Sequence, residues 1–151
     1  MKSLIPKNIL NEIPKSNSVN SKAVRRSILQ RELAALKGLS FRNRYLSAPV
    51  KCLDKTINEI VVHSSKSYLS TLAALHLKQA IIYSSVLYVD LPKSGKQMRT
   101  FGAWITIILH CSIEGVGNTK LTLVDSLMGY PEKGVLNLSA YCLTKQKETV
   151  S

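Results

Sequence analysis

Alternating apolar and polar residues in the second half of the chain constrain the fold more than any other feature. On a β-strand, successive side chains point to opposite faces, so residues two positions apart share a face. In 120–125 this rule places Leu121, Leu123 and Asp125 together, on the face that the two leucines mark as the core side. A carboxylate that faces a core is costly unless it is hydrogen-bonded or paired. We therefore predict that Asp125 is held inside the fold, accepting backbone N–H bonds from the turn after it.

Other segments share this β-type composition and are separated by turns rich in Gly, Pro and Asn. These turns lie at 92–96, 114–119 and 129–131. One segment, 67–79, instead contains Leu, Ala, Lys and Gln, which favour a helix. Short strands with turns between them predict a mainly β fold, an antiparallel β-sandwich or barrel with one or two short helices. The predicted strands are 56–63, 81–91, 101–113, 120–127 and 134–145.

Basic residues gather in the N-terminal third of a chain that, at 151 residues, is long enough for one domain with a core. Residues 1–55 hold 12 Lys and Arg against 3 Asp and Glu, while residues 56–151 hold 9 against 6. Such a segment suits polyanions, meaning RNA, DNA or an anionic membrane surface; the alternative is a solvated tail that binds nothing. The sequence predicts a basic, partly disordered arm over 1–47, a β-sandwich domain over 48–145 and a tail over 146–151.

An amphipathic helix is predicted over 21–37 within this arm. Ser21 can cap its start, and Gly38 lies just past its end. Surface helices that bind membranes or partners show such a pattern. An ordinary helix packed on its own domain shows it too, and this is the interpretation that we favour. The apolar stripe consists of Ile28, Leu29, Leu33 and Leu36, and the arginines assigned to positions off the stripe are Arg25, Arg26 and Arg31.

Basic side chains are the candidate contacts to a nucleic-acid backbone, because Lys and Arg neutralise phosphates and release counterions. Around Phe41 and Tyr45 they are interleaved with aromatic rings that can stack on bases. The candidates are Lys22, Arg25, Arg26, Arg31, Arg42 and Arg44, with Lys51 and Lys55 as weaker ones.

No combination of residues predicts catalysis or a bound cofactor. Three widely spaced cysteines without a Cys-x-x-Cys pair predict neither a disulfide framework nor a zinc site, and they favour a reducing compartment. His110 and Cys111 are neighbours on a predicted strand, so they point to opposite faces and cannot act as a pair. We predict a protein that is not an enzyme and holds no metal. The longest apolar run, 101–113, is too short to span a bilayer, so we expect a soluble, intracellular protein, with peripheral membrane contact left open.

The order of several segments resembles a known family. The similar part begins at Ala48-Pro-Val-Lys51, continues to Ile60-Val-Val-His63, and passes into the Ser- and Leu-rich stretch 64–75. Lys120-Leu-Thr-Leu-Val-Asp125 resembles a strand that carries a signature aspartate, and 133–142 resembles the strand after it. Over 48–145 the chain is similar to the 30K superfamily of plant-virus cell-to-cell movement proteins.

This resemblance implies a jelly-roll-like β-sandwich with Asp125 as a structural signature residue. It also implies a movement protein that binds single-stranded RNA or DNA without sequence preference and assists its transport through plasmodesmata. The implied setting is the host cell cytoplasm and its plasmodesmal junctions, with host plasmodesmal proteins, further copies of the chain and host membrane as partners. Many members carry a basic residue two positions after the aspartate, where this chain has Leu127, and most are longer, so the chain resembles a truncated or minimal member. The alternative is a small viral structural protein, capsid-like or matrix, whose basic arm binds the genome or an anionic membrane.

Overall fold

The computed structural model describes residues 2–90, 105–116, 119–132 and 135–150, with side chains described over 2–85 and at Cys111, Ile113, Asn137 and Leu138. In this part of the chain the helices are α1 (Lys7–Glu12), α2 (Val19–Leu33), α3 (Asp54–Ser64), α4 (Tyr68–Leu75) and α5 (Leu77–Tyr83), with a short 3-10 helix η1 (Ala34–Leu36). The strands are β1 (Ser40–Phe41), β2 (Val50–Cys52), β3 (Ser85–Asp90), β4 (Ile105–Val116), β5 (Thr119–Glu132) and β6 (Val135–Val150).

The described strands form a single sheet in the order β1-β2-β6-β5-β4-β3. Strands β3 to β6 run antiparallel, each beside the next in the chain. At the other side of β6 the early strand β2 pairs in parallel, with Val50 opposite Leu136 and Cys52 opposite Leu138. The N-terminal half of the chain therefore extends a sheet that the C-terminal half builds.

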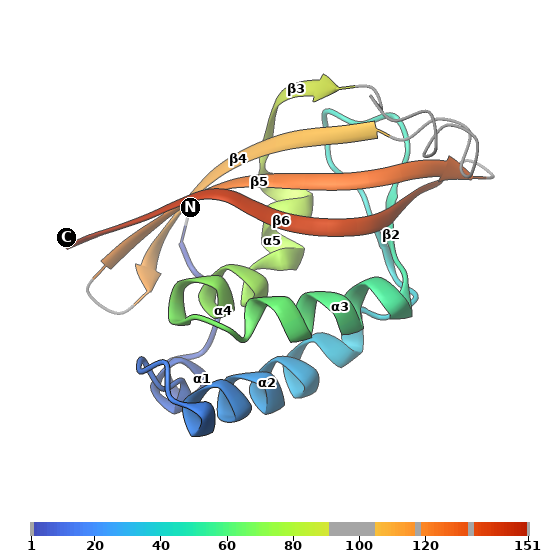
Figure 1. The fold of residues 1–151 in the computed structure, drawn as a ribbon. Helices are drawn as coiled ribbons and strands as arrows, with labels where there is room; N and C mark the ends of the chain where they lie inside the picture. The colour runs from blue at the N-terminus through green and yellow to red at the C-terminus, as the bar shows by residue number, and fades with distance from the viewer. Residues whose placement is uncertain (1, 91–104, 117–118, 133–134, 151) are drawn as a thin grey trace.

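Figure 1 shows the helices on one side of this sheet. α3, α4 and α5 lie next to the strands, and α1 and α2 lie farther away, with α2 against α3 and α4. The hydroxyl of Thr56, in the first turn of α3, donates to the carbonyl oxygen of Leu138 in β6 at 2.5 Å. This bond joins the helical layer to the sheet directly.

The core lies between the sheet and the helices and draws on nearly every described element. Burial of apolar side chains is the main favourable term in folding, at about 25 cal/mol per Å². The buried apolar residues are Ile13, Ile28, Leu29, Leu33, Val50, Cys52, Ile57, Ile60, Val61, Leu72, Ala73, Ala74, Leu75, Leu77, Ala80, Ile81, Cys111, Ile113 and Leu138.

The predicted mainly β fold, a jelly-roll-like sandwich, is wrong. A sandwich requires a second sheet packed over the first, whereas here helices cover the sheet. The fold is an α+β arrangement, with helices on one face of a mostly antiparallel sheet. The physical reason is that α3, α4 and α5 supply the apolar surface that a second sheet would otherwise have supplied.

The strand predicted over 56–63 is part of helix α3. Its Ile and Val residues suggested a strand, because β-branched residues are enriched there. The buried side chains, however, are Thr56, Ile57, Ile60 and Val61. Spacings of three and four residues form one face of a helix, so periodicity outweighed residue type.

The helix predicted over 21–37 is confirmed as α2 followed by η1. Its N-cap is Ser18 rather than Ser21, since the Ser18 hydroxyl accepts the Ser21 N–H bond at 3.1 Å. Gly38 lies past its end with a φ of +78°, a conformation that glycine adopts at little cost. The loose arm predicted for this region is wrong, because Ile13 and the α2 stripe belong to the common core.

The three long C-terminal strands lie close to their predicted positions. The helix predicted over 67–79 is present as α4 and the first three residues of α5, which continues to Tyr83. β5 continues through the turn predicted at 129–131, with a bulge at Met128 and Gly129, and the tail predicted at 146–151 belongs to β6 as far as Val150. Asp125 pairs with Leu109 and Leu143 beside another bulge. Its side chain lies outside the described residues, so its burial stays a prediction.

Candidate nucleic-acid interface

Arg25 is one of the predicted nucleic-acid contacts, but it cannot make such a contact because its side chain is fully buried. Its guanidinium donates to the carbonyl oxygens of Ser65 at 2.9 Å, Pro14 at 3.0 Å, Ser16 at 2.5 Å and Lys66 at 3.2 Å. Ser65 caps the C-terminus of α3, where the helix dipole favours a cation. Arg25 therefore ties α2 to the end of α3 and to the chain before α2.

The spacing within α2 explains this placement. Arg25 precedes Ile28 by three residues and Leu29 by four, so it lies on the apolar stripe and not beside it. Ser21, one turn earlier, is buried as well. The position of Arg25 on the apolar stripe was therefore the sequence signal that this arginine is buried.

The other basic residues of α2 are exposed but differ in their partners. Arg31 pairs with Glu12 at 2.7 Å and with Glu32 at 2.9 Å. These hydrogen bonds, that to Glu12 first, raise the pKa of Arg31. Lys22 and Arg26 are exposed one turn apart on the outer side of α2, so they remain candidates for a weak, diffuse contact with a polyanion.

The two weaker candidates lie apart from each other. Lys51 is half-buried in β2, between Ser40 of β1 and Asn137 of β6 in the sheet register. Lys55 is exposed at the start of α3, beside a shallow hollow that Glu59 also lines. The acidic neighbour makes Lys55 a poor phosphate contact.

Arg42 and Arg44 lie together in the loop between β1 and β2, and both are exposed. Asn43, between them, is buried and holds the loop in place. Its amide nitrogen donates to Ile81 O at 2.9 Å and to Ser84 O at 2.8 Å, and its Oδ1 accepts from the Tyr45 N–H at 2.8 Å. This inward asparagine turns its two neighbours outward.

The loop faces a hollow of about 650 Å³ whose described lining consists of Arg42, Asn43, Arg44, Leu46, Ile82 and Tyr83, without an acidic side chain. Tyr83, at the end of α5, is 58% exposed and Tyr45 is 53% exposed. The guanidinium carbon of Arg44 lies 4.8 Å from the centroid of the Tyr45 ring, a cation–π contact. We call Arg42, Arg44, Tyr45 and Tyr83 the arginine–tyrosine surface.

Sequence reasoning found the two arginines and Tyr45 of this surface but missed Tyr83. It assigned Tyr83 to a strand over 81–91, and α5 instead continues to this residue. Lys78, five residues earlier on α5, was also missed, and its ammonium lies 5.5 Å from the centroid of the Phe41 ring. One further turn of the helix predicted over 67–79 would have included Tyr83, and Lys78 already lies within that predicted helix.

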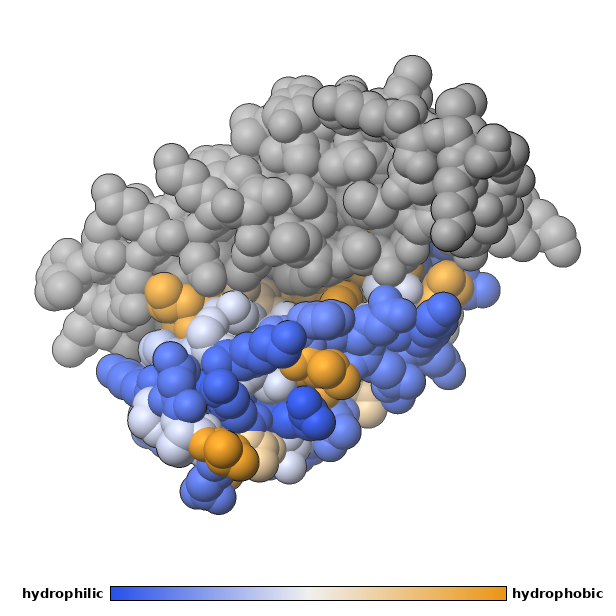
Figure 2. All heavy atoms as spheres, viewed as in Figure 1, coloured by the Kyte–Doolittle hydropathy of each residue, from blue (hydrophilic) through white to orange (hydrophobic). Residues whose placement is uncertain are grey.

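The face of the helical layer that Figure 2 shows is mostly hydrophilic, with separate apolar patches. Among the described residues, no cluster of His, Cys, Asp and Glu could hold a metal ion. Cys52 is a buried free thiol whose pKa burial raises to about 11. Such a thiol is mainly protonated near neutral pH and is a poor nucleophile.

Known protein families, characterised proteins and solved structures offer no match to this chain. In the described part of the chain, no helix has both the length and the apolar character needed to cross a membrane. The similarity to plant-virus movement proteins therefore stays a prediction from the residues alone.

Proposed function

We propose that this protein binds single-stranded nucleic acid, RNA or DNA, without sequence preference at the arginine–tyrosine surface. The observation that supports this most directly is the position of Tyr83, which comes from α5 to line the same hollow as Arg42 and Arg44. Guanidinium groups match phosphate oxygens in a bidentate way and also stack on planar rings. The surface thus combines phosphate neutralisation with stacking.

The exposed rings favour single strands over a duplex. Bases of a single strand can stack on aromatic side chains, and such stacking tolerates any base because each has a π-face. In a duplex these faces are occupied by neighbouring bases. The net charge of +12 adds long-range attraction for any polyanion, so the rings, rather than the charge, carry the preference.

The test is fluorescence anisotropy of labelled single strands of unrelated sequence across a salt series. We expect wild type to bind all of them, with affinity that falls steeply with salt. The double variant Arg42→Gln/Arg44→Gln should reduce the slope of log affinity against log salt by about 1.4, or about 0.7 for each of two phosphate contacts. Tyr83→Ser should weaken binding by about 1–3 kcal/mol, and Tyr83→Phe should retain it.

The matched control is Lys22→Gln/Arg26→Gln, which removes the same charge from the outer side of α2. Equal losses of nucleic-acid affinity in the two double variants would show that net charge, and not this surface, controls binding. Tighter binding to duplex than to single strands, or a strong preference for one sequence, would also contradict the proposal.

A viral transport role was implied only by the resemblance, which also implied a β-sandwich, whereas the described strands form a single sheet with helices on one face. We infer that nucleic-acid binding is the part that the geometry supports, and we retain cell-to-cell transport as a prediction. Enlarged passage of a fluorescent reporter between plant cells would support transport. Assembly of the protein into shells would instead support the capsid-like or matrix alternative.

A further inference from the structure

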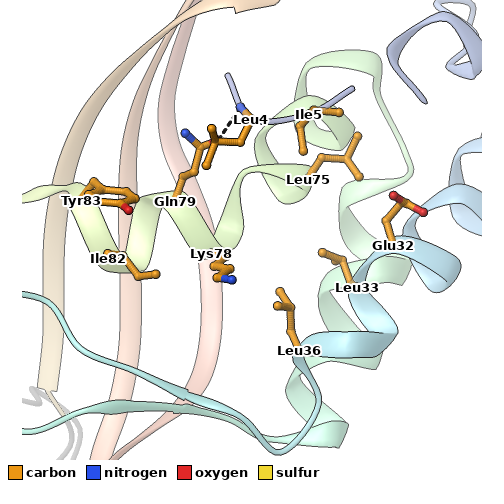
Figure 3. Close-up of a pocket in the computed structure, with 10 residues that line it drawn as sticks. All are labelled: Leu4, Ile5, Glu32, Leu33, Leu36, Leu75, Lys78, Gln79, Ile82 and Tyr83. Carbon is orange, nitrogen blue, oxygen red and sulfur yellow. Dashed lines mark hydrogen bonds between the residues drawn. The ribbon is translucent and has the colours of Figure 1, made fainter. Parts of the chain in front are cut away.

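A second hollow, of about 330 Å³, lies between α5, the end of α2 and the N-terminal residues 2–5, which we call the strap. Figure 3 shows Leu33 and Leu36 approaching it from the α2 side, with Lys78 and Ile82 on α5. Small-molecule sites start at about 300 Å³ and are mostly apolar with a few polar groups. The hollow meets this description in both size and lining.

The strap forms a fixed wall of this hollow. Leu4 N–H donates to the Gln79 Oε1 atom at 3.2 Å, and the Gln79 amide nitrogen donates to Lys2 O at 3.0 Å. Ser3 Oγ lies 2.7 Å from Nε2 of His76. His76 and Gln79 are both buried, and buried polar groups left without partners are costly. Specific hydrogen bonds to His76 and Gln79 therefore hold the strap in place as a wall of the hollow.

The charges around the hollow favour an anion at its α5 side. Lys78 lines it, and Ile82 and Tyr83 are shared with the adjoining hollow that Arg42 and Arg44 line. Glu32, on the α2 side, is already paired with Arg31 at 2.9 Å. A ligand with an apolar body and one negative group fits this distribution.

We propose that this hollow binds a free fatty acid, with its acyl chain against Leu33, Leu36 and Leu75 and its carboxylate paired with Lys78. A hollow of this size takes one acyl chain, whereas a membrane phospholipid carries two. Each methylene moved from water into an apolar site adds about fourfold in affinity, so chain length controls binding. The proposal does not rest on the nucleic-acid function, although the two adjoining hollows share Ile82 and Tyr83.

The test is calorimetric titration of the intact protein with dodecanoate below its micelle concentration, and with octanoate and dodecanol. We expect dodecanoate to bind more tightly than octanoate. Leu36→Trp fills the hollow and should lower the affinity for dodecanoate by about tenfold or more, as the loss of two buried methylenes would. Leu39→Trp is the matched control, because Leu39 is 48% exposed and lies outside the described lining.

Lys78→Gln provides the second variant, at an exposed position that should not affect folding. This variant should weaken the binding of dodecanoate and leave the binding of dodecanol unchanged, whereas Lys66→Gln should change neither affinity. Unchanged dodecanoate binding in Lys78→Gln, or in a folded Leu36→Trp, would overturn the proposal. Binding to phosphatidylserine vesicles without binding of free dodecanoate would also overturn it, and would assign this surface to a membrane instead.

Discussion

At the scale of single residues, the basic side chains differ in what they can contact, although the sequence presents them alike. Arg25 is a buried cation whose five donated bonds go to uncharged oxygens, four of them backbone carbonyls. Burial of an unpaired charge is costly, but carbonyl dipoles at the end of α3 offset that cost. Arg42 and Arg44 are exposed because Asn43 occupies the buried position between them. Local environment, and not residue type, therefore separates the buried structural arginine from the two arginines that we propose as nucleic-acid contacts.

The buried arginine yields a stability prediction. Arg25→Met leaves several buried carbonyls without donors and should lower the free energy of unfolding by at least about 1–3 kcal/mol. Arg26→Met removes the same charge from an exposed neighbour and should change it by about 0.5 kcal/mol or less. Urea unfolding followed by circular dichroism measures both. If the two variants had equal midpoints, the structural role of Arg25 would be disproved.

At the scale of elements, contacts between segments decide what local preference leaves open. α3 is a helix despite its β-branched residues, because one face of it packs on β6 and another on α2. The strap joins α4 and α5 through His76, whose Nδ1–H donates to Leu72 O at 2.6 Å. The other ring nitrogen of neutral His76 then accepts from Ser3. The strap is thus tied to a titratable group.

The buried, hydrogen-bonded His76 predicts that the stability of the protein depends on pH. Burial lowers the pKa of His76, more than its bond to Leu72 O raises it. The folded state then favours neutral imidazole, so stability is complete above the unfolded pKa of about 6.5 and declines as pH falls below it. Urea midpoints measured on either side of that pH should show this decline in wild type and a smaller one in His76→Gln. His63→Gln, at an exposed histidine, is the control and should leave the decline unchanged.

At the scale of the whole molecule, the described helices and strands share one core. Ile13, Ile28, Leu29 and Leu33 from the predicted arm pack in the same cluster as residues from β2, α3, α5 and β4. Pairing of β2 with β6 further joins the two halves of the chain. The arm and the sheet domain are therefore parts of one folding unit among the described residues.

This shared core predicts the result of a truncation. A chain that begins at residue 48 loses four buried apolar side chains, each worth about 1.5–3 kcal/mol on full burial, a loss comparable to the total stability of a typical domain. We expect it to show no cooperative thermal transition by circular dichroism, in contrast to the full chain. A truncated chain that melts cooperatively near the full-length temperature would restore the separate domain predicted over 48–145.

Features that depend on neighbours along the chain could be predicted from the residues alone. The α2 stripe, the glycine after it and the alternating strands β4 and β5 follow from periodicity and capping, which act over a few residues. Three features became clear only from the three-dimensional fold: helices cover the sheet, Arg25 is buried, and Tyr83 lines the same hollow as Arg42 and Arg44. These outcomes depend on contacts between distant segments, such as the bond from Asn43 to Ile81, 38 positions apart. A local sequence pattern does not specify such pairings, because any apolar face can be buried by more than one partner.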